Sequence, residues 1–195
     1  MPSEFLSIVD QYATRLNTAL SSLDPGMADE LAHALLACWK TGRRVFLCGN
    51  GGSAANALHL ANDFHYGIGG GRQPGLRSHA LPANVAILTC LANDESYAEI
   101  FSKQLEVEGE PGDILIVLSG SGNSPNIVRA LEQAKRMGIR SFAVLGFDGG
   151  KAKGLADVPI HFAIDDMQIS EDLQLAVGHI LMQWLCKNPP EEKRP

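Results

Sequence analysis

Two loops of small and polar residues carry the groups in this sequence that could hold a phosphorylated ligand. Residues 49–53, Gly-Asn-Gly-Gly-Ser, separate an apolar segment from an alanine-rich one, and residues 119–124, Ser-Gly-Ser-Gly-Asn-Ser, follow a nearly continuous apolar segment. Hydroxyls and backbone N–H groups at the start of a helix bind a phosphate monoester, and glycine lets the backbone approach it closely. The second loop therefore predicts a phosphate site, with a turn that only caps a helix as the alternative.

The first loop, together with Ala54, also matches the GxGxxA pattern of a dinucleotide-binding turn. That pattern needs an acidic residue about 20 positions further on, which binds the ribose hydroxyls. The sequence has no Asp or Glu between Asp63 and Asp94. A nicotinamide-type cofactor is therefore disfavoured.

Strands and helices must position these loops, and the two kinds of element alternate along the middle of the chain. Apolar segments predict strands at residues 43–48, 113–118, 140–145 and 158–162, and helical spacing predicts helices at residues 3–22, 27–40, 54–64, 97–107, 125–137 and 170–186. This order predicts an α/β fold, a doubly wound three-layer sandwich with a central parallel sheet, preceded by a helical pair over residues 3–40.

Shorter features connect these elements. Ser53 is the expected N-cap of the helix that follows the first loop. Residues 84–92 are expected to be helical or mixed, and Asn93-Asp94 is a predicted turn. Residues 67–75 contain five glycines and one proline, which predicts a mobile loop rather than a packed element.

Composition and charge narrow the class of protein. The chain is 45% hydrophobic and 19% charged, which is typical of a globular protein, and we expect a single domain over residues 1–187 with a solvated tail at 188–195. Its 16 basic and 22 acidic residues give a net charge of −6 with no basic stripe, so we expect no direct binding of nucleic acid. We also expect no membrane span and no secretory signal, and the four isolated cysteines favour a cytoplasmic location.

Several of these motifs together resemble a known family. Cys48-Gly49-Asn50-Gly51-Gly52-Ser53, Asn93-Asp94, the loop 119–124 and Asp148-Gly149-Gly150 are similar, in order and spacing, to a sugar isomerase (SIS) domain. Within that superfamily the sequence most resembles the sedoheptulose 7-phosphate isomerases, also called phosphoheptose isomerases, over nearly the whole chain. The resemblance implies an aldose–ketose isomerase in the first step of nucleotide-activated heptose synthesis, with a bound zinc ion and active sites between the subunits of a homotetramer.

The resemblance also implies roles for individual residues. By this resemblance, the substrate is contacted by Asn50, Gly51, Gly52, Ser53, Asn93 and Asp94. Its phosphate is bound by Ser119, Gly120, Ser121 and Ser124. The implied metal ligands are His59, Asp63, Glu171 and His179. Asp63 and Glu171 also take substrate-binding and catalytic roles, and His179 takes a catalytic one.

Spacing supports part of this ligand set. His59 and Asp63 are four residues apart, so on a helix they project from one face and could bind one ion, although an ordinary surface pair has the same spacing. Glu171 and His179 lie about 12 Å apart along a straight helix. They could meet only if Glu171 sits at a frayed helix start or if the two act across a subunit boundary. A set of His, Asp, Glu and His suits zinc, with manganese or iron as substitutes.

Three positions depart from the family's pattern. Asp63 stands where the family usually has a glutamate that is base and ligand, and Glu171 stands where it usually has a glutamine. Which carboxylate is the base therefore stays open. Gly67 replaces a common arginine, and Arg72 and Arg77 in the following stretch are the alternative cations.

The implied reaction moves a proton between C1 and C2 of a sugar phosphate through an enediol. It needs a carboxylate base and an acid or metal near the reacting oxygens. We expect Asp63 or Glu171 as the base, His179 as its acid/base partner and His59 as a metal ligand. Two alternatives stay open. The protein could be an isomerase or sensor for another sugar phosphate. It could also be a tetrameric adaptor that binds the replication initiator, because such adaptors share the Ala-Ala-Asn-Ala sequence of residues 54–57.

Overall fold

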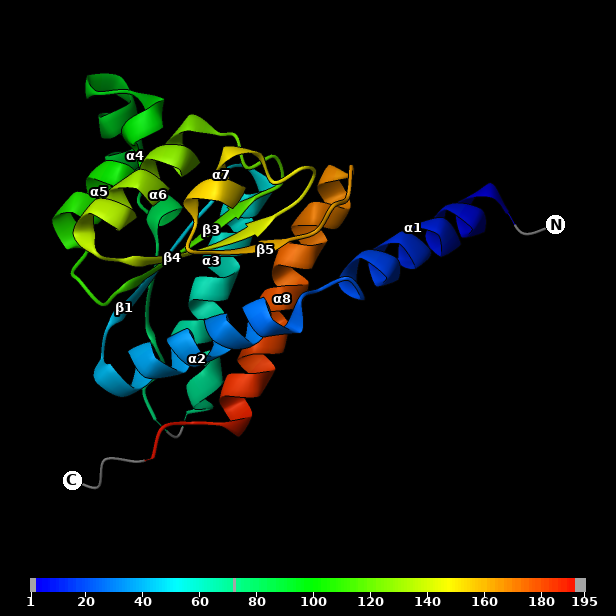
Figure 1. Ribbon diagram of the computed structural model, residues 1–195, viewed down its shortest axis with the longest axis horizontal. Coiled ribbons are helices and arrows are strands. Elements are labelled where there is room, and N and C mark those ends of the chain that lie inside the picture. The colour runs from blue at the N-terminus through cyan, green and yellow to red at the C-terminus, as the bar shows by residue number, and fades with distance from the viewer. Residues whose placement is uncertain (1–2, 72, 192–195) are drawn as a thin grey trace.

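A computed structural model describes residues 3–71 and 73–191 of the chain. Within these residues the strands form one parallel sheet in the order β2-β1-β3-β4-β5. The strands are β1 (Arg44–Cys48), β2 (Arg77–Ala80), β3 (Ile114–Ser119), β4 (Arg140–Leu145) and β5 (Val158–His161). Helices cover the sheet on both faces, which confirms the predicted doubly wound three-layer sandwich (Figure 1).

Two groups of helices make the outer layers. The helices are α1 (Glu4–Leu20), α2 (Pro25–Thr41), α3 (Gly52–His65), α4 (Val85–Asp94), α5 (Ser102–Glu108), α6 (Pro125–Met137), α7 (Gly150–Leu155) and α8 (Met167–Lys187), with 3-10 turns η1 (Gly67–Gly69), η2 (Leu81–Ala83) and η3 (Tyr97–Glu99). Helices α2, α3 and α8 contribute to the core on one face of the sheet, and α5, α6 and α7 to the core on the other. The predicted N-terminal helical pair corresponds to α1 and α2, and α1 projects from the body of the molecule (Figure 1).

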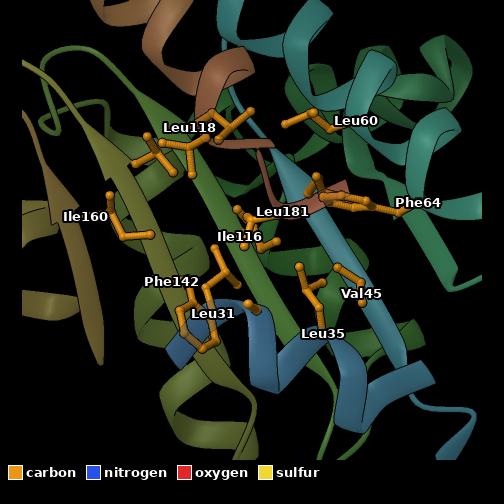
Figure 2. Packing of buried hydrophobic residues seen from close by; sticks show 14 of the residues in the cluster. Leu31, Leu35, Val45, Leu60, Phe64, Ile116, Leu118, Phe142, Ile160 and Leu181 are labelled. Atoms are coloured by element: carbon orange, nitrogen blue, oxygen red, sulfur yellow. The ribbon is translucent and has the colours of Figure 1, made fainter. Parts of the chain in front are cut away.

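A hydrophobic core lies between the sheet and helices α2, α3 and α8 (Figure 2). Of these helices, α3 and α8 carry the candidate metal ligands. Leu31 and Leu35 from α2, Leu60 from α3 and Leu181 from α8 are buried in this core beside the strand side chain of Ile116. Burying one such side chain stabilises a fold by roughly 1.5–3 kcal/mol. This packing fixes α3 and α8 against each other and against the sheet.

The order of the strands creates a switch point between β1 and β3, and the region beyond the carboxyl ends of these two strands is named the crevice. The chain leaves β1 toward β2 on one side, whereas β3 continues to β4 and β5 on the other, so the direction of winding changes between β1 and β3. Ligands of such sheets bind beyond the carboxyl ends of the strands at this switch point. Residues 49–53 follow β1 and residues 119–124 follow β3, so the two predicted ligand loops lie at this crevice.

The structure corrects several local predictions. Asn93 and Asp94 are not a turn but the last residues of α4. Ser53 is not the N-cap of α3, because the helix already begins at Gly52 with Gly51 in the cap position. The segment 67–75 is not wholly a loop, since η1 packs Ile68 into the core, while Arg72 lies outside the described residues.

Other elements differ in extent. The predicted helix 97–107 is divided into η3 and α5, and α8 begins at Met167 rather than at residue 170. The carboxylate of Asp166 caps α8 by accepting a hydrogen bond from Ile169 N, and this bond, together with the Arg15 guanidinium, lowers the pKa of Asp166. Strand β2 and helix α7 were not predicted. Among the described residues no helix is both long enough and apolar enough to cross a membrane.

Two neighbouring leucines of α3 test the packing of this layer. Leu60 is 2% exposed and Leu58 is 43% exposed. We expect Leu60→Ala to lower the free energy of unfolding by about 2–5 kcal/mol, because it leaves a cavity in the core. Leu58→Ala is the matched control and should change it by less than about 0.5 kcal/mol. Urea denaturation measures both values, and equal losses would contradict the packing described.

Candidate active site

The glycine turn, residues 49–53, delivers the start of α3 to the crevice. Gly51 adopts φ +57, a conformation that favours glycine, and thereby turns the chain from β1 directly into the helix. No side chain caps α3. Because the first N–H groups of a helix have no partner within it, this turn can offer donors to an anionic or hydroxyl-rich ligand.

The serine loop, residues 119–124, offers hydroxyls beside the glycine turn. Ser119 Oγ accepts a hydrogen bond from Gly122 N at 3.0 Å, and Ser121 Oγ accepts one from Asn123 N at 3.3 Å. Each hydroxyl hydrogen therefore remains available to a phosphate oxygen. Ser124 occupies the N-cap position of α6, yet its side chain makes no capping bond. A capping role for the Ser124 side chain is therefore not observed.

The segment 146–152 holds the serine loop in shape. Gly146 N donates to Gly120 O at 3.0 Å, and Ala152 N donates to Gly122 O at 2.9 Å. Gly122 has φ +64, and a Cβ atom there would lie 2.0 Å from the carbonyl oxygen of Gly149. The Asp-Gly-Gly motif at 148–150 therefore serves the site indirectly, as the surface on which the serine loop packs.

Three of the four predicted metal ligands converge. His59 and Asp63 project from α3, and His179 projects from α8, with one ligand atom of each lying within 4.8 Å of the others. The two Nε2 atoms of His59 and His179 are 2.9 Å apart, and Asp63 Oδ2 lies 3.3 Å and 3.5 Å from them, respectively. The i, i+4 spacing predicted for His59 and Asp63 on one helix face is thereby confirmed.

These separations fit a small tetrahedral ion. Ligand atoms bound tetrahedrally to zinc at about 2.0–2.1 Å lie about 3.3 Å from one another. The three distances in the cluster, 2.9, 3.3 and 3.5 Å, bracket this value. Two imidazole nitrogens and one carboxylate oxygen are also a set that zinc accepts, with a fourth position left for substrate or water.

Glu171 lies apart from this cluster, at the glycine turn. It is in the second turn of α8 rather than at a frayed helix start, and its carboxylate fills the space beside Gly52, where an added Cβ would lie 2.3 Å from Oε2. Asn56 Nδ2 donates to the Glu171 carbonyl and to Gln174 Oε1, and Gln174 Nε2 donates to Ser53 Oγ. This buried network fixes Glu171 against the start of α3.

Two further ionisable groups, Asp94 and Cys48, differ in their exposure. Asn93 Nδ2 donates to Asp94 Oδ1 at 2.7 Å, and this bond, with one from Cys90, lowers the pKa of Asp94, so the exposed carboxylate stays ionised at neutral pH. Cys48 directly precedes the glycine turn, but complete burial raises the pKa of its thiol. Cys48 therefore remains a protonated core residue and supplies no thiolate.

Comparisons with known proteins show the family to which the chain belongs. Residues 10–146 match the family model described as "SIS domain". The phosphoheptose isomerase of Akkermansia muciniphila is 38% identical over 183 residues, which cover 93% of this chain and 92% of that protein. The chain belongs to the phosphoheptose isomerase family. A second member, from Desulfovibrio desulfuricans, is 36% identical over 94% of this chain and 88% of its own length.

Solved structures of the family share the whole fold. Phosphoheptose isomerase GmhA from Neisseria gonorrhoeae aligns with a TM-score of 0.86 at 26% identity, covering 96% of this chain and 100% of that one. A phosphoheptose isomerase from Francisella tularensis gives the same TM-score and coverage at 27% identity. The predicted family resemblance is thereby confirmed.

Gly67 stands where phosphoheptose isomerases commonly have an arginine, and Arg72 and Arg77 were the predicted alternative cations. A Cβ at Gly67 would lie 2.6 Å from Met182 Cε, so the tip of Met182 occupies the room next to this position. Arg77 begins β2 and donates to the Gly42 carbonyl, at the amino end of the sheet and away from the crevice. Arg72 lies outside the described residues.

Sequence reasoning missed two residues that contact Asn50, which was predicted to bind the substrate. Asn126 and Tyr97 both hydrogen-bond to the side chain of Asn50. The sequence did contain a sign that Asn126 has a role. It is a polar residue directly after Ser124-Pro125, on a helix face whose other buried residues are apolar. Tyr97 carried no signal, because its partner is 47 residues away in the sequence.

The contact between α3 and α8 can be tested by coupling two substitutions. A Cβ at Gly178 would lie 2.2 Å from Leu60 Cδ2, so we expect Gly178→Val to lower the free energy of unfolding by about 1–3 kcal/mol through overpacking. Leu60→Ala in the same chain makes room for the valine. The double variant should therefore lose about 1 kcal/mol less than the sum of the two single losses. Additive losses in urea denaturation would show that the two residues do not meet.

Proposed function

We propose that this protein is a phosphoheptose isomerase that converts sedoheptulose 7-phosphate to D-glycero-D-manno-heptose 7-phosphate. The observation that carries the proposal is the arrangement made by α3 and α8, which brings His59, Asp63 and His179 together and separately sets the Glu171 carboxylate against Gly52 of the glycine turn. Relatives named for this activity match the chain along almost its whole length. This would be the first step of nucleotide-activated heptose synthesis.

The two ends of the substrate would be held by different loops. The hydroxyls of Ser119, Ser121 and Ser124 and the backbone at Gly120 would bind the phosphate. The glycine turn, with Asn93 and Asp94, would contact the sugar. Binding energy gained at the phosphate then orients the reacting carbons, which lie at the other end of the molecule.

We propose Glu171 as the base that moves the proton between C1 and C2. Asp63 Oδ2 lies between the two imidazoles and is suited to hold an ion, whereas the Glu171 carboxylate lies outside that cluster, next to Gly52. His179 would exchange protons with the substrate oxygens of the enediol. His59, Asp63 and His179 would hold zinc, which when bound polarises the substrate carbonyl.

Substitution of each carboxylate distinguishes base from ligand. We expect Glu171→Gln to lower kcat by about 10²–10⁴-fold, because the base is lost, while the protein keeps its zinc. Asp63→Asn should instead lower zinc affinity by about 100-fold or more, because loss of a direct ligand exceeds the roughly 10–100-fold effect of losing a supporting residue. Turnover of sedoheptulose 7-phosphate and zinc content, measured on metal-stripped and zinc-loaded protein, give both values.

Other outcomes of this experiment are equally clear. Full activity of Glu171→Gln would assign the base to Asp63. Absence of turnover by the zinc-loaded wild type would contradict the proposed substrate. It would move the assignment to another sugar phosphate or to the adaptor role.

We further propose that the enzyme is a homotetramer in the cytoplasm. The apolar stripe of α1 packs Tyr12, Leu16 and Leu20 against the body of the protein, but its N-terminal half continues beyond the body (Figure 1). There Phe5 is 71% exposed, and Ile8 is also exposed. A second copy of the chain would cover this surface. The location is supported by the four free cysteines.

Two adjacent residues of α1 test this assembly. We expect Ile8→Asp to dissociate the tetramer into smaller species, because it places a charge in the apolar stripe. Ser7→Asp adds the same charge on the polar side of the helix and should leave the mass unchanged. Light scattering coupled to size exclusion measures both, and a wild type that is already monomeric would contradict the proposal.

A further inference from the structure

Asn126 is a buried amide to which the reaction assigns no role. It lies in the first turn of α6, directly after Ser124 and Pro125, and its surface is fully covered. Its partner is Asn50 in the glycine turn. Asn50 Nδ2 donates to Asn126 Oδ1 at 2.9 Å, and Asn126 Nδ2 donates to Asn50 Oδ1 at 2.8 Å. The two side chains thus form a reciprocal pair of hydrogen bonds.

A backbone group fixes which way each amide points. Ile127 N donates to Asn126 Oδ1 at 3.0 Å, and a backbone N–H can only donate, so the atom that faces it must be the amide oxygen. The same oxygen faces Asn50 Nδ2. Asn50 Oδ1 is consequently the acceptor for Asn126 Nδ2 and for the hydroxyl of Tyr97 at 2.9 Å. Tyr97 must therefore donate its proton to Asn50.

These bonds connect three segments around the crevice. Asn50 follows β1, Asn126 follows the serine loop after β3, and Tyr97 begins η3, three residues after Asp94. The glycine turn and the serine loop belong to different strand–helix units, and a bound sugar phosphate would have to contact both. The Asn50–Asn126 pair sets the separation of the two loops where such a ligand would bind.

We propose that Asn126 is a positioning residue for the substrate, which acts through Asn50, and that Tyr97 holds Asn50 from the exposed side. The inference builds on the proposed function, since it concerns how a phosphorylated sugar is held between the two loops. Neither residue belongs to the metal cluster. Their loss should therefore weaken substrate binding more than it slows the chemical step.

Tyr97→Phe is the mildest test, because it removes one hydroxyl from a ring that is 60% exposed. We expect KM for sedoheptulose 7-phosphate to rise about 3- to 10-fold, the usual effect of losing one hydrogen bond, with kcat and Tm unchanged. Tyr66→Phe is the matched control, since that ring is 70% exposed at the opposite end of α3. It should leave KM unchanged.

Asn126→Asp gives a readout that a merely structural role would not produce. A protonated carboxyl in this place has one donor for Asn50 Oδ1 and one acceptor for Ile127 N, as the native amide has. The ionised form has only acceptors. Because burial raises the pKa of a carboxyl, KM should approach the wild-type value at low pH and rise by about tenfold as the introduced group ionises. Asn126→Leu, which cannot titrate, should have a high KM at every pH.

The outcomes separate this inference from the proposed function. Unchanged KM in Tyr97→Phe, or a loss of Tm and activity in Asn126→Asp without a pH-dependent KM, would overturn the positioning role while wild-type turnover upholds the isomerase. If the wild type does not turn over the substrate, calorimetric binding of the same sugar phosphate replaces KM as the readout. Weaker binding by Tyr97→Phe would then uphold the positioning role alone, and a wild type that neither converts nor binds the sugar phosphate would overturn both.

Discussion

The close contact between α3 and α8 is the interaction on which the candidate site depends. Gly178 lets α8 approach Leu60 of α3 so closely that no side chain fits between them. The residues next to this contact in the sequence are His179 and His59, whose Nε2 atoms lie 2.9 Å apart. The same helix pair sets the Glu171 carboxylate against Gly52. A shift between the two helices would therefore disturb the candidate metal ligands and the Glu171 carboxylate together.

The sheet supplies the second half of the site in a different way. Its switch point between β1 and β3 brings the glycine turn and the serine loop to one crevice, but parallel strands alone do not fix the distance between the loops that follow them. Buried polar contacts between the loops do so, through Asn50 and Asn126 on one side and through the segment 146–152 on the other. Apolar packing thus positions the proposed metal ligands, and polar pairing positions the groups proposed to hold the substrate.

The sequence alone predicted an element correctly where residues typical of a helix start or end mark its boundaries. Helix α6 was predicted at its observed residues, because Pro125 begins it and Gly138, in a left-handed conformation, ends it. Strand β2, Arg-Ser-His-Ala, was missed because it has no apolar run, being an edge strand with alternate residues exposed. Asn93-Asp94 resembled a turn by composition, yet the residues before it continue the hydrogen bonding of α4 to Asp94.

The site was predictable to the extent that its members share one helix. The spacing of His59 and Asp63 gave their common face, but no spacing could show that His179 joins them while Glu171 does not, since that depends on how α8 crosses α3. Charge gives a physical reason for assigning the role of base to Glu171 and the role of metal ligand to Asp63. The resemblance places a neutral glutamine where this chain has Glu171, and a second anion there would oppose the negative charge that develops on an enediolate. A Glu171 that has taken the substrate's proton is neutral, as glutamine is, at the moment when that charge appears. The extra carboxylate is thus compatible with the reaction when Glu171 is its base, and Asp63 is left to hold the ion.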